Sequence, residues 1–143
     1  MSHNQDFDLQ TFMPYLLNRA AEASSQGFQS YYKGRYGMLR TEWRVLFHLG
    51  RYGEMTATEI CDRTSVHKTK VSRAVSALEK KRFLSRKLQE ADRRHEALSL
   101  TKAGLHAYSD LSREAQKFEG KLLGQFDEQE LAILRRCLIQ MAS

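Results

Sequence analysis

The sequence contains few cysteines, a single proline and no long apolar run. Its two cysteines, Cys61 and Cys137, are far apart and have no CxxC partner, which predicts a reduced protein with buried thiols. One proline and eight glycines among 143 residues favour a helical globular protein over a disordered one. No segment has the length of apolar sequence that spans a bilayer, and the N-terminus lacks the apolar core of a secretory signal. We therefore expect a cytoplasmic protein with no membrane partner.

The sequence motifs of the common enzyme classes are also absent. There is no P-loop, no GxSxG, no HExxH and no dinucleotide-binding glycine pattern, so we expect no catalytic residues, no cofactor and no enzymatic activity. The five histidines are scattered along the chain and form no HxxxH or Cys/His cluster. The sequence therefore predicts no metal site.

Basic residues are concentrated in one part of the chain. The formal net charge is +6, and residues 65–95 hold ten Lys and Arg against three acids, whereas the remainder has thirteen basic and fourteen acidic residues. Such a concentration is typical of a surface that binds a polyanion. A membrane-surface patch would carry the same charge, but no exposed Trp or Phe accompanies the basic face.

This basic segment includes the stretch on which the interpretation depends, residues 67–82. Val71, Val75 and Leu78 recur at helical spacing and predict an amphipathic helix. By itself the pattern also fits an ordinary surface helix. A short helix over about 57–63, with a Thr-x-x-Glu capping box at its start, and a turn at 64–66 precede it. Two helices joined in this way, the second basic, form the helix-turn-helix pattern. The polar face carries Lys68, Thr69, Lys70, Ser72, Arg73 and Ser76.

After Arg82 the apolar period changes from 3.6 to 2. Leu84, Arg86 and Leu88 alternate with polar neighbours, and the alternation resumes near residue 98, which predicts a two-stranded hairpin, or wing. Arginines at the tip of such a hairpin suit phosphates and a narrow minor groove. The alternative is a surface hairpin whose loop is merely polar. The loop, residues 89–95, includes Asp92, Arg93 and Arg94.

Four more helices are expected outside this region. A first helix over about 11–32, with Pro14 in its first turn, is followed by a loop at 33–37, and a second helix covers about 41–51. A long helix follows Thr101 and is striped by residues such as Leu105 and Leu111, and a last helix begins at a capping box at 127–130. The first helix and the two C-terminal helices cannot all bury their apolar faces against one small central unit, so we expect a homodimer. Packing within one monomer is the alternative.

In this order and spacing the segments resemble the MarR family of winged-helix transcription regulators. The likeness spans about residues 16–141. It implies a mainly α (α+β) fold, in which a winged helix-turn-helix DNA-binding lobe at 37–101 lies between an N-terminal dimerisation helix and tail at 1–36 and C-terminal dimerisation helices at 102–143. The residues that carry the resemblance are Thr41–Leu46, Lys68–Val75 with Leu78 and Glu79, Asp92-Arg93-Arg94, and Leu100-Thr101-x-x-Gly104.

The resemblance implies a sequence-specific regulator, more often a repressor, that binds a pseudo-palindromic double-stranded DNA operator as a homodimer. Helix 67–82 would enter the major groove, with the polar residues named above as base and phosphate contacts. The wing would lie in the minor groove, where Asp92 braces the loop and Arg94 reaches the groove. Because a fold does not determine function, a protein-interaction module is the competing hypothesis.

The resemblance also suggests a ligand, since many relatives are released from DNA by small aromatic acids. Residues that would form such a site are Arg19, Trp43, Phe47 and His48. The alternative is that Trp43 and Phe47 belong to the core and Arg19 to the surface. Peroxide-sensing relatives have a cysteine near the start of the first helix, whereas this chain has none before Cys61. We therefore expect its thiols to be inert.

Two positions depart from the family pattern. Ser65 or His67 would cap the recognition helix, and His67 stands where relatives often have Asp, which predicts weaker or pH-sensitive capping. Arg82 stands where relatives usually have Gly just after the helix. If φ is positive there, a side chain costs roughly 1 kcal/mol, although a cation suits the helix C-terminus.

Overall fold

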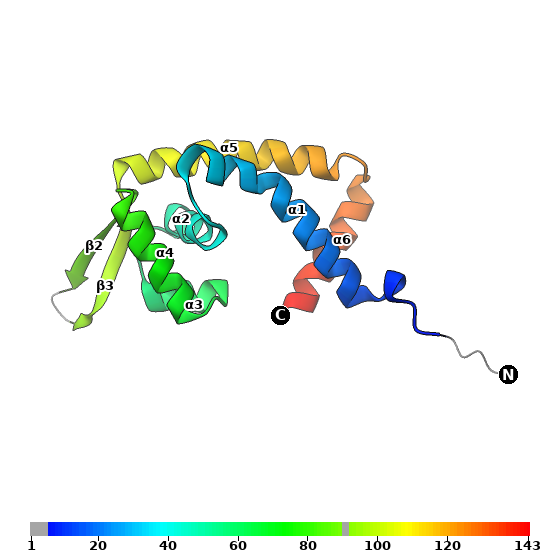
Figure 1. The fold of residues 1–143 in the computed structure, drawn as a ribbon, viewed down its shortest axis with the longest axis horizontal. Helices are drawn as coiled ribbons and strands as arrows, with labels where there is room; N and C mark the ends of the chain where they lie inside the picture. The colour runs from blue at the N-terminus through cyan, green and yellow to red at the C-terminus, as the bar shows by residue number, and fades with distance from the viewer. Residues whose placement is uncertain (1–5, 90–91) are drawn as a thin grey trace. The chain divides into compact units, whose positions relative to one another are not determined.

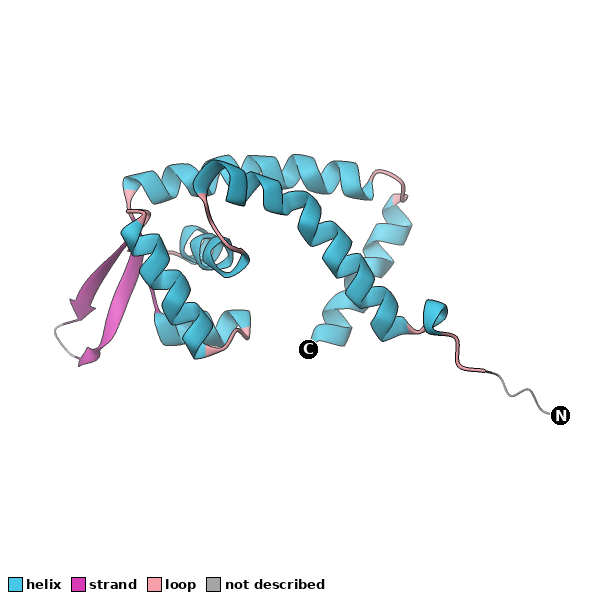
Figure 2. Cartoon of the chain, viewed as in Figure 1, coloured by secondary structure: helices cyan, strands magenta, loops and turns pink. Residues whose placement is uncertain are grey.

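The computed structural model describes residues 6–89 and 92–143, apart from the side chains of residues 89 and 92–95. Helices make up most of the described chain, and its strands form one small antiparallel sheet (Figure 2). This composition confirms the expected mainly α fold class. After a 3-10 turn at Leu9–Thr11, the elements in chain order are α1 (Met13–Tyr36), α2 (Arg40–Tyr52), β1 (Met55–Thr56), α3 (Ala57–Thr64), α4 (Lys68–Lys80), β2 (Leu84–Gln89), β3 (Asp92–Leu100), α5 (Lys102–Leu123) and α6 (Glu128–Ala142). All of them except the short β1 are labelled in Figure 1.

The chain divides into two compact units. One, here called the helical unit, comprises residues up to Phe28 and from Ala115 onward. The other, here called the winged lobe, comprises Gln29–Glu114 and holds the helix-turn-helix segment and the sheet. Helices α1 and α5 each contribute to both units. The assignment of residues 1–36 and 102–143 to dimerisation stays a prediction.

Helix α1 extends further than the sequence predicted. Residues 33–36, expected to be a loop, form its last turn, and the break comes at Gly37, whose φ is +64°. Gly34 is a weak helix former, but the residues that follow it gain partners from α5 that outweigh this cost. Pro14 lies in the first turn, as predicted, where its missing N–H has no helical partner.

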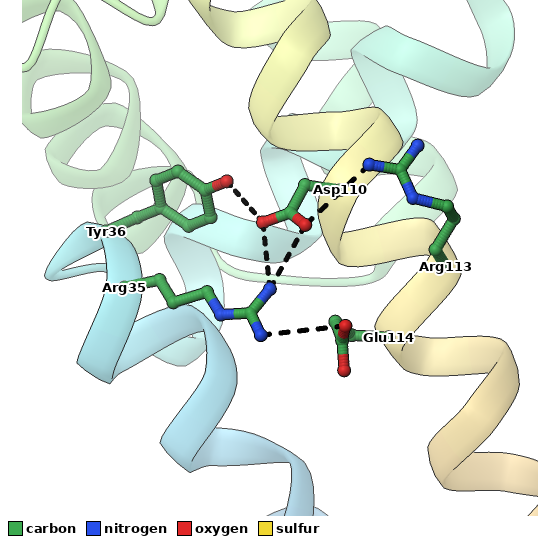
Figure 3. A network of polar contacts seen from close by, with 5 residues as sticks. All are labelled: Arg35, Tyr36, Asp110, Arg113 and Glu114. Atoms are coloured by element: carbon green, nitrogen blue, oxygen red, sulfur yellow. Dashed lines mark hydrogen bonds and ion pairs between the residues drawn. The ribbon is translucent and has the colours of Figure 1, made fainter.

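Those partners form the polar network of Figure 3. The Tyr36 hydroxyl donates to Asp110 at 2.5 Å, and Arg35 donates to both oxygens of Asp110 at 3.1 Å and pairs with Glu114 at 3.6 Å. Arg113 lies 3.8 Å from the same carboxylate. The hydrogen bond from Tyr36 lowers the pKa of Asp110 most, and the hydrogen bonds from Arg35 lower it further. Burial and the hydrogen bond to Asp110 raise the pKa of Tyr36 to about 12. The end of α1 is thus fixed to α5 within the winged lobe.

The core of the winged lobe is built from the predicted helical stripes. Val71, Val75 and Leu78 of α4 are buried, as their spacing predicted. They join apolar residues of neighbouring elements, and burial of each side chain of this kind contributes about 1.5–3 kcal/mol. The buried neighbours include Val45, Leu46, Leu49, Ile60, Leu84, Leu98, Ala107 and Leu111.

The sheet has one strand more than the sequence predicted. Its order is β1-β3-β2, and β1 pairs with β3 through Met55 opposite Leu98 and Thr56 opposite Ala97. A two-residue strand is too short to show a period of 2. The inward alternation of the hairpin holds at Leu84, which is buried, but fails at Leu88, which is 59% exposed beside a register shift.

Helix α4 ends in a Schellman arrangement around Arg82. The Arg82 N–H donates to the Glu79 carbonyl and the Phe83 N–H to the Leu78 carbonyl, each at 2.9 Å. Arg82 has φ +65°, so the left-handed turn expected of a glycine is formed by an arginine. The Thr101 hydroxyl donates to the Arg82 carbonyl at 2.7 Å, which holds this turn in place.

Thr101 also begins α5, as predicted, because its hydroxyl accepts from the Gly104 N–H at 3.0 Å. Gly104 is needed for close approach: a Cβ at this position would lie 2.0 Å from the Phe83 carbonyl oxygen. The prediction that Leu105 lies on the buried face of α5 is wrong, because this residue is 52% exposed. The buried face is formed by Gly104, Ala107 and Leu111, of which Leu111 was predicted.

In the helical unit, the capping box of α6 is complete, as predicted. The Asp127 carboxylate accepts from the Glu130 N–H at 2.8 Å, and the Glu130 carboxylate accepts from the Asp127 N–H at 3.0 Å.

Both cysteines, Cys61 and Cys137, are partly exposed, so the expectation of buried thiols is wrong. Among the described residues, no helix is both long and apolar enough to cross a membrane.

Candidate nucleic-acid interface

Side-chain caps define the turn between α3 and α4. The Thr56 hydroxyl accepts from the Glu59 N–H at 3.2 Å, but the Glu59 carboxylate accepts from this hydroxyl rather than from the Thr56 N–H. Only the hydroxyl half of the predicted capping box is therefore present, and Thr56 also lies in β1. At the other end, Ser65 adopts φ 55° and ends α3. The His67 Nδ1 accepts from the Thr69 N–H at 3.1 Å, so His67 caps α4.

The outer face of α4 carries the six residues of this helix that were predicted to contact DNA. Its inner residues are buried, whereas the predicted contacts project from the opposite side and are exposed. Three of them are cations and three are hydroxyl donors, which suits a mixture of phosphate and base contacts. The exposed residues are Lys68, Thr69, Lys70, Ser72, Arg73 and Ser76.

This face borders a concave surface between the helix-turn-helix and the sheet. The hollow has a volume of about 670 Å³. Helix α3 contributes Thr58 and Cys61, α4 contributes Lys68 and Ser72, and the sheet contributes polar side chains of its own. The partly exposed Cys61 thiol therefore lines the hollow beside the predicted contact residues.

The wing and α4 are joined by a contact that the sequence did not predict. Arg86 of β2 reaches Glu79 and Ser76 of α4 and Glu96 of β3. The backbone of residues 92–95 lies in β3, but their side chains are outside the described part of the structure. The roles of Asp92, Arg93 and Arg94 therefore stay predictions.

A second unpredicted contact fixes the C-terminal end of α4. The Lys81 ammonium donates to the Glu42 carboxylate at 2.5 Å and to the Gly37 carbonyl at 2.7 Å. Glu42 is only 4% exposed, and the Lys81 ammonium supplies the opposite charge beside this buried carboxylate. The contact joins the start of α2 to the end of α4.

Three of the four predicted ligand residues line one pocket. Trp43, Phe47 and His48 surround a cavity of about 270 Å³, together with Arg44, Arg63 and Thr64. The Trp43 and Phe47 rings meet edge to face at 4.8 Å. The fourth residue, Arg19, belongs to the helical unit, where its guanidinium lies 5.8 Å from the Tyr15 ring centre.

The pocket has cations of its own, because both Arg44 and Arg63 line it. The Arg63 guanidinium also stacks on Tyr52, 4.1 Å from the ring centre.

In the part of the chain that the structure describes, no three His, Cys, Asp or Glu side chains lie close enough together to hold a metal ion.

Comparisons with known proteins agree with this architecture. The chain matches the MarR family over residues 36–95. It is 30% identical over 95 residues to the HTH-type transcriptional regulator YwoH of Bacillus subtilis (strain 168), a match that covers 66% of this chain and 69% of that protein.

Solved structures resemble the whole chain. A MarR/EmrR family transcriptional regulator from Acinetobacter sp. ADP1 aligns with a TM-score of 0.84 and 26% identity, covering 95% of this chain and 96% of the other. Bordetella bronchiseptica BpsR, whose DNA binding is regulated by 6-hydroxynicotinic acid, aligns with a TM-score of 0.86 and 18% identity, covering 96% and 98%. These relatives are regulators rather than enzymes, and the winged-helix fold is the one that the sequence predicted. The chain belongs to the MarR family of transcriptional regulators.

Proposed function

We propose that this regulator binds a pseudo-palindromic double-stranded DNA operator as a homodimer, in the cytoplasm, and represses transcription until a small aromatic acid releases it. The observation that carries the proposal is the exposed polar face of α4. Its cations and hydroxyls project from a helix whose other face is anchored in the core. A helix held in this way can enter the major groove without losing its packing.

The roles on DNA follow from residue chemistry. Lys68 and Lys70 supply flexible cations for phosphates, whereas Arg73 can donate two parallel hydrogen bonds to the edge of a guanine. Thr69, Ser72 and Ser76 supply hydroxyls. In the wing, Arg94 reaches the minor groove, assisted by Arg93, and Asp92 braces the loop.

The dimer explains why apolar side chains stay exposed in the helical unit of a single chain. In α6, Ile133, Leu138 and Ile139 are 54%, 39% and 70% exposed, and Leu16 of α1 is 41% exposed. Exposed apolar surface of this extent suits an interface between subunits. A two-fold dimer would present two α4 helices to successive turns of the major groove, which accounts for a pseudo-palindromic operator.

The ligand proposal rests on the pocket at Trp43, Phe47 and His48. Aromatic walls fit a planar ring, and Arg44 and Arg63 can balance a carboxylate. The regulation of BpsR by an aromatic acid supports the same class of ligand for this chain. The expected ligand is therefore a single-ring aromatic carboxylate.

The test compares substitutions on α4 with a matched loss of charge elsewhere. Operator DNA selected from a random pool is titrated by fluorescence anisotropy with the wild type, Arg73→Ala, Ser72→Ala and Arg94→Ala. Lys121→Ala, an exposed cation in the helical-unit part of α5, is the control. Arg73→Ala and Ser72→Ala should lose about 1–3 kcal/mol of discrimination between operator variants. Arg94→Ala should weaken binding to most sequences and reduce the salt dependence.

Equal affinity of the wild type and the α4 variants would refute the DNA-binding assignment. The competing function, a winged helix that binds protein, predicts that no sequence is enriched from the DNA pool. A ligand that binds this pocket should lower operator affinity, and Arg44→Ala should weaken that effect while leaving DNA affinity without ligand unchanged.

A further inference from the structure

One side chain connects the recognition helix to both strands of the wing. Arg86 lies on β2. Its Nε donates to Glu79 Oε1 at 3.1 Å and its Nη2 donates to Ser76 Oγ at 3.1 Å, and both acceptors belong to α4. Its Nη1 donates to Glu96 Oε2 on β3 at 3.2 Å. Three nitrogens of a rigid, planar guanidinium therefore point to three acceptors on two other elements.

We propose that Arg86 is a positioning residue for DNA binding. It holds the wing in a fixed orientation relative to α4 in the DNA-free protein. The inference rests on the proposed function, because the helix and the wing must meet the duplex together. A pre-set arrangement avoids the entropy cost of ordering the wing during association. Arg86 then acts on DNA through α4 and the wing, and not by direct contact.

The charges around Arg86 argue against a phosphate contact. Its guanidinium already faces two carboxylates, Glu79 and Glu96, at hydrogen-bonding distance. A phosphate would have to displace them. The Ser76 hydroxyl accepts from Arg86 in this arrangement, and its own O–H is still a donor for the DNA contact proposed above.

Geometry, rather than ion-pair strength, is the basis of this role. The side chains of Arg86, Glu79 and Glu96 are 33%, 45% and 38% exposed. Ion pairs at such exposure are weak individually because solvent screens them. What distinguishes this group is that it limits the angle between two separate elements, and only the three-donor fork satisfies all acceptors at once.

The first test separates the shape of the guanidinium from its charge. Arg86→Lys retains a cation but cannot meet three acceptors in three directions, and Arg86→Gln removes the cation. Both variants should weaken operator binding by about five-fold to ten-fold, and the slope of log K against log salt should equal that of the wild type. A restored affinity in Arg86→Lys, with a slope lowered by about one per chain in Arg86→Gln, would identify a phosphate contact and overturn the proposal.

The second test uses the sign of an electrostatic effect. If only charge mattered, removing a carboxylate from this surface in Glu96→Ala would tighten binding. Glu96→Ala also removes the acceptor for Arg86 Nη1, so binding should instead weaken, by about two-fold to five-fold. Tighter binding by Glu96→Ala contradicts the positioning role.

The third test asks whether Arg86 acts through the wing. Arg86→Lys should cost less in an Arg94→Ala background, because a wing without its groove contact gains little from being positioned. A merely structural residue would give additive losses, and additivity would overturn the proposal.

The last test needs no DNA. Amide hydrogen exchange at residues 84–88 and 96–100 should accelerate in Arg86→Lys, while exchange in α1 and α6 stays at the wild-type rate. If the wild type binds no DNA, the proposed function fails, and exchange still reports on the contact. If the wild type binds DNA but Arg86→Lys matches it in affinity or in wing exchange, the positioning role fails alone.

Discussion

Replacing Gly104 with alanine separates two physical expectations of opposite sign. Gly104 lies in the first turn of α5, where helix propensity alone favours alanine by up to about 1 kcal/mol. An added Cβ would lie 2.0 Å from the Phe83 carbonyl oxygen and 3.2 Å from the Leu100 Cβ. The first of these atoms is backbone and cannot rotate away, so the helix and the turn after α4 must move apart by roughly 1 Å. Overpacking of this kind costs about 1–3 kcal/mol or more.

The net expectation is a loss of about 2 kcal/mol, since about 3 kcal/mol of overpacking exceeds about 1 kcal/mol of propensity. For a chain of this size that corresponds to a decrease in Tm of roughly 4–8 °C, measured by circular dichroism at fixed protein concentration. Gly34→Ala is the matched control, because nothing lies within 4 Å of its added Cβ and Gly34 is in the last turn of α1. That variant should be unchanged or gain up to about 3 °C. A Gly104→Ala protein as stable as Gly34→Ala would refute the close contact between α5 and Phe83.

Substitutions at Asp110, Lys81 and Arg82 test further local interactions of the winged lobe. Because Tyr36 and Arg35 lower the pKa of Asp110, its charge stabilises the fold above the ordinary Asp pKa of about 4. Asp110→Asn should therefore unfold more easily than the wild type in urea at pH 7, and the gap should close as the pH falls through the lowered pKa. Lys81→Met leaves the buried Glu42 carboxylate without its ammonium partner and should cost about 2–4 kcal/mol, which Glu42→Leu in the same chain should largely restore. Arg82→Gly should raise the Tm by about 1–3 °C, since φ is +65° there, while Arg82→Ala should not.

The sequence predicted the helix-turn-helix and the wing because their patterns are local. Val71, Val75 and Leu78 identify the buried face of α4, and the change of period after Arg82 identifies the hairpin. The capping box of α6 was also evident from residues close in sequence. Such features depend on backbone geometry within one element, so composition and spacing are sufficient to predict them.

Contacts between elements were harder to predict. The end of α1 was placed too early because Gly34 suggests a loop, whereas Tyr36 and Arg35 are held by Asp110, 74 and 75 residues away in sequence. Strand β1 was missed because two residues carry no alternation. Tertiary partners override local propensity in both cases.

A usable signal existed for Arg86. The alternation of the hairpin places Arg86 on the same face of β2 as the buried Leu84, which indicates that its long side chain lies near a neighbouring element. Which acceptors it finds depends on how α4 lies beside β2, and the spacing of residues does not contain that information. The ligand residues show the same limit, since the pocket at Trp43 also includes Arg44 and Arg63.

The most direct test of the central claim is the salt dependence of operator binding. Selected operator DNA and a scrambled duplex are titrated by fluorescence anisotropy at 50 and 200 mM salt. If six to ten cations of a dimer neutralise phosphates, affinity should fall by about 10³–10⁵ between these concentrations, and the operator should bind far more tightly than the scrambled duplex at both. Weak binding that is equal for both duplexes and insensitive to salt would contradict the claim that α4 and the wing form a DNA-binding surface.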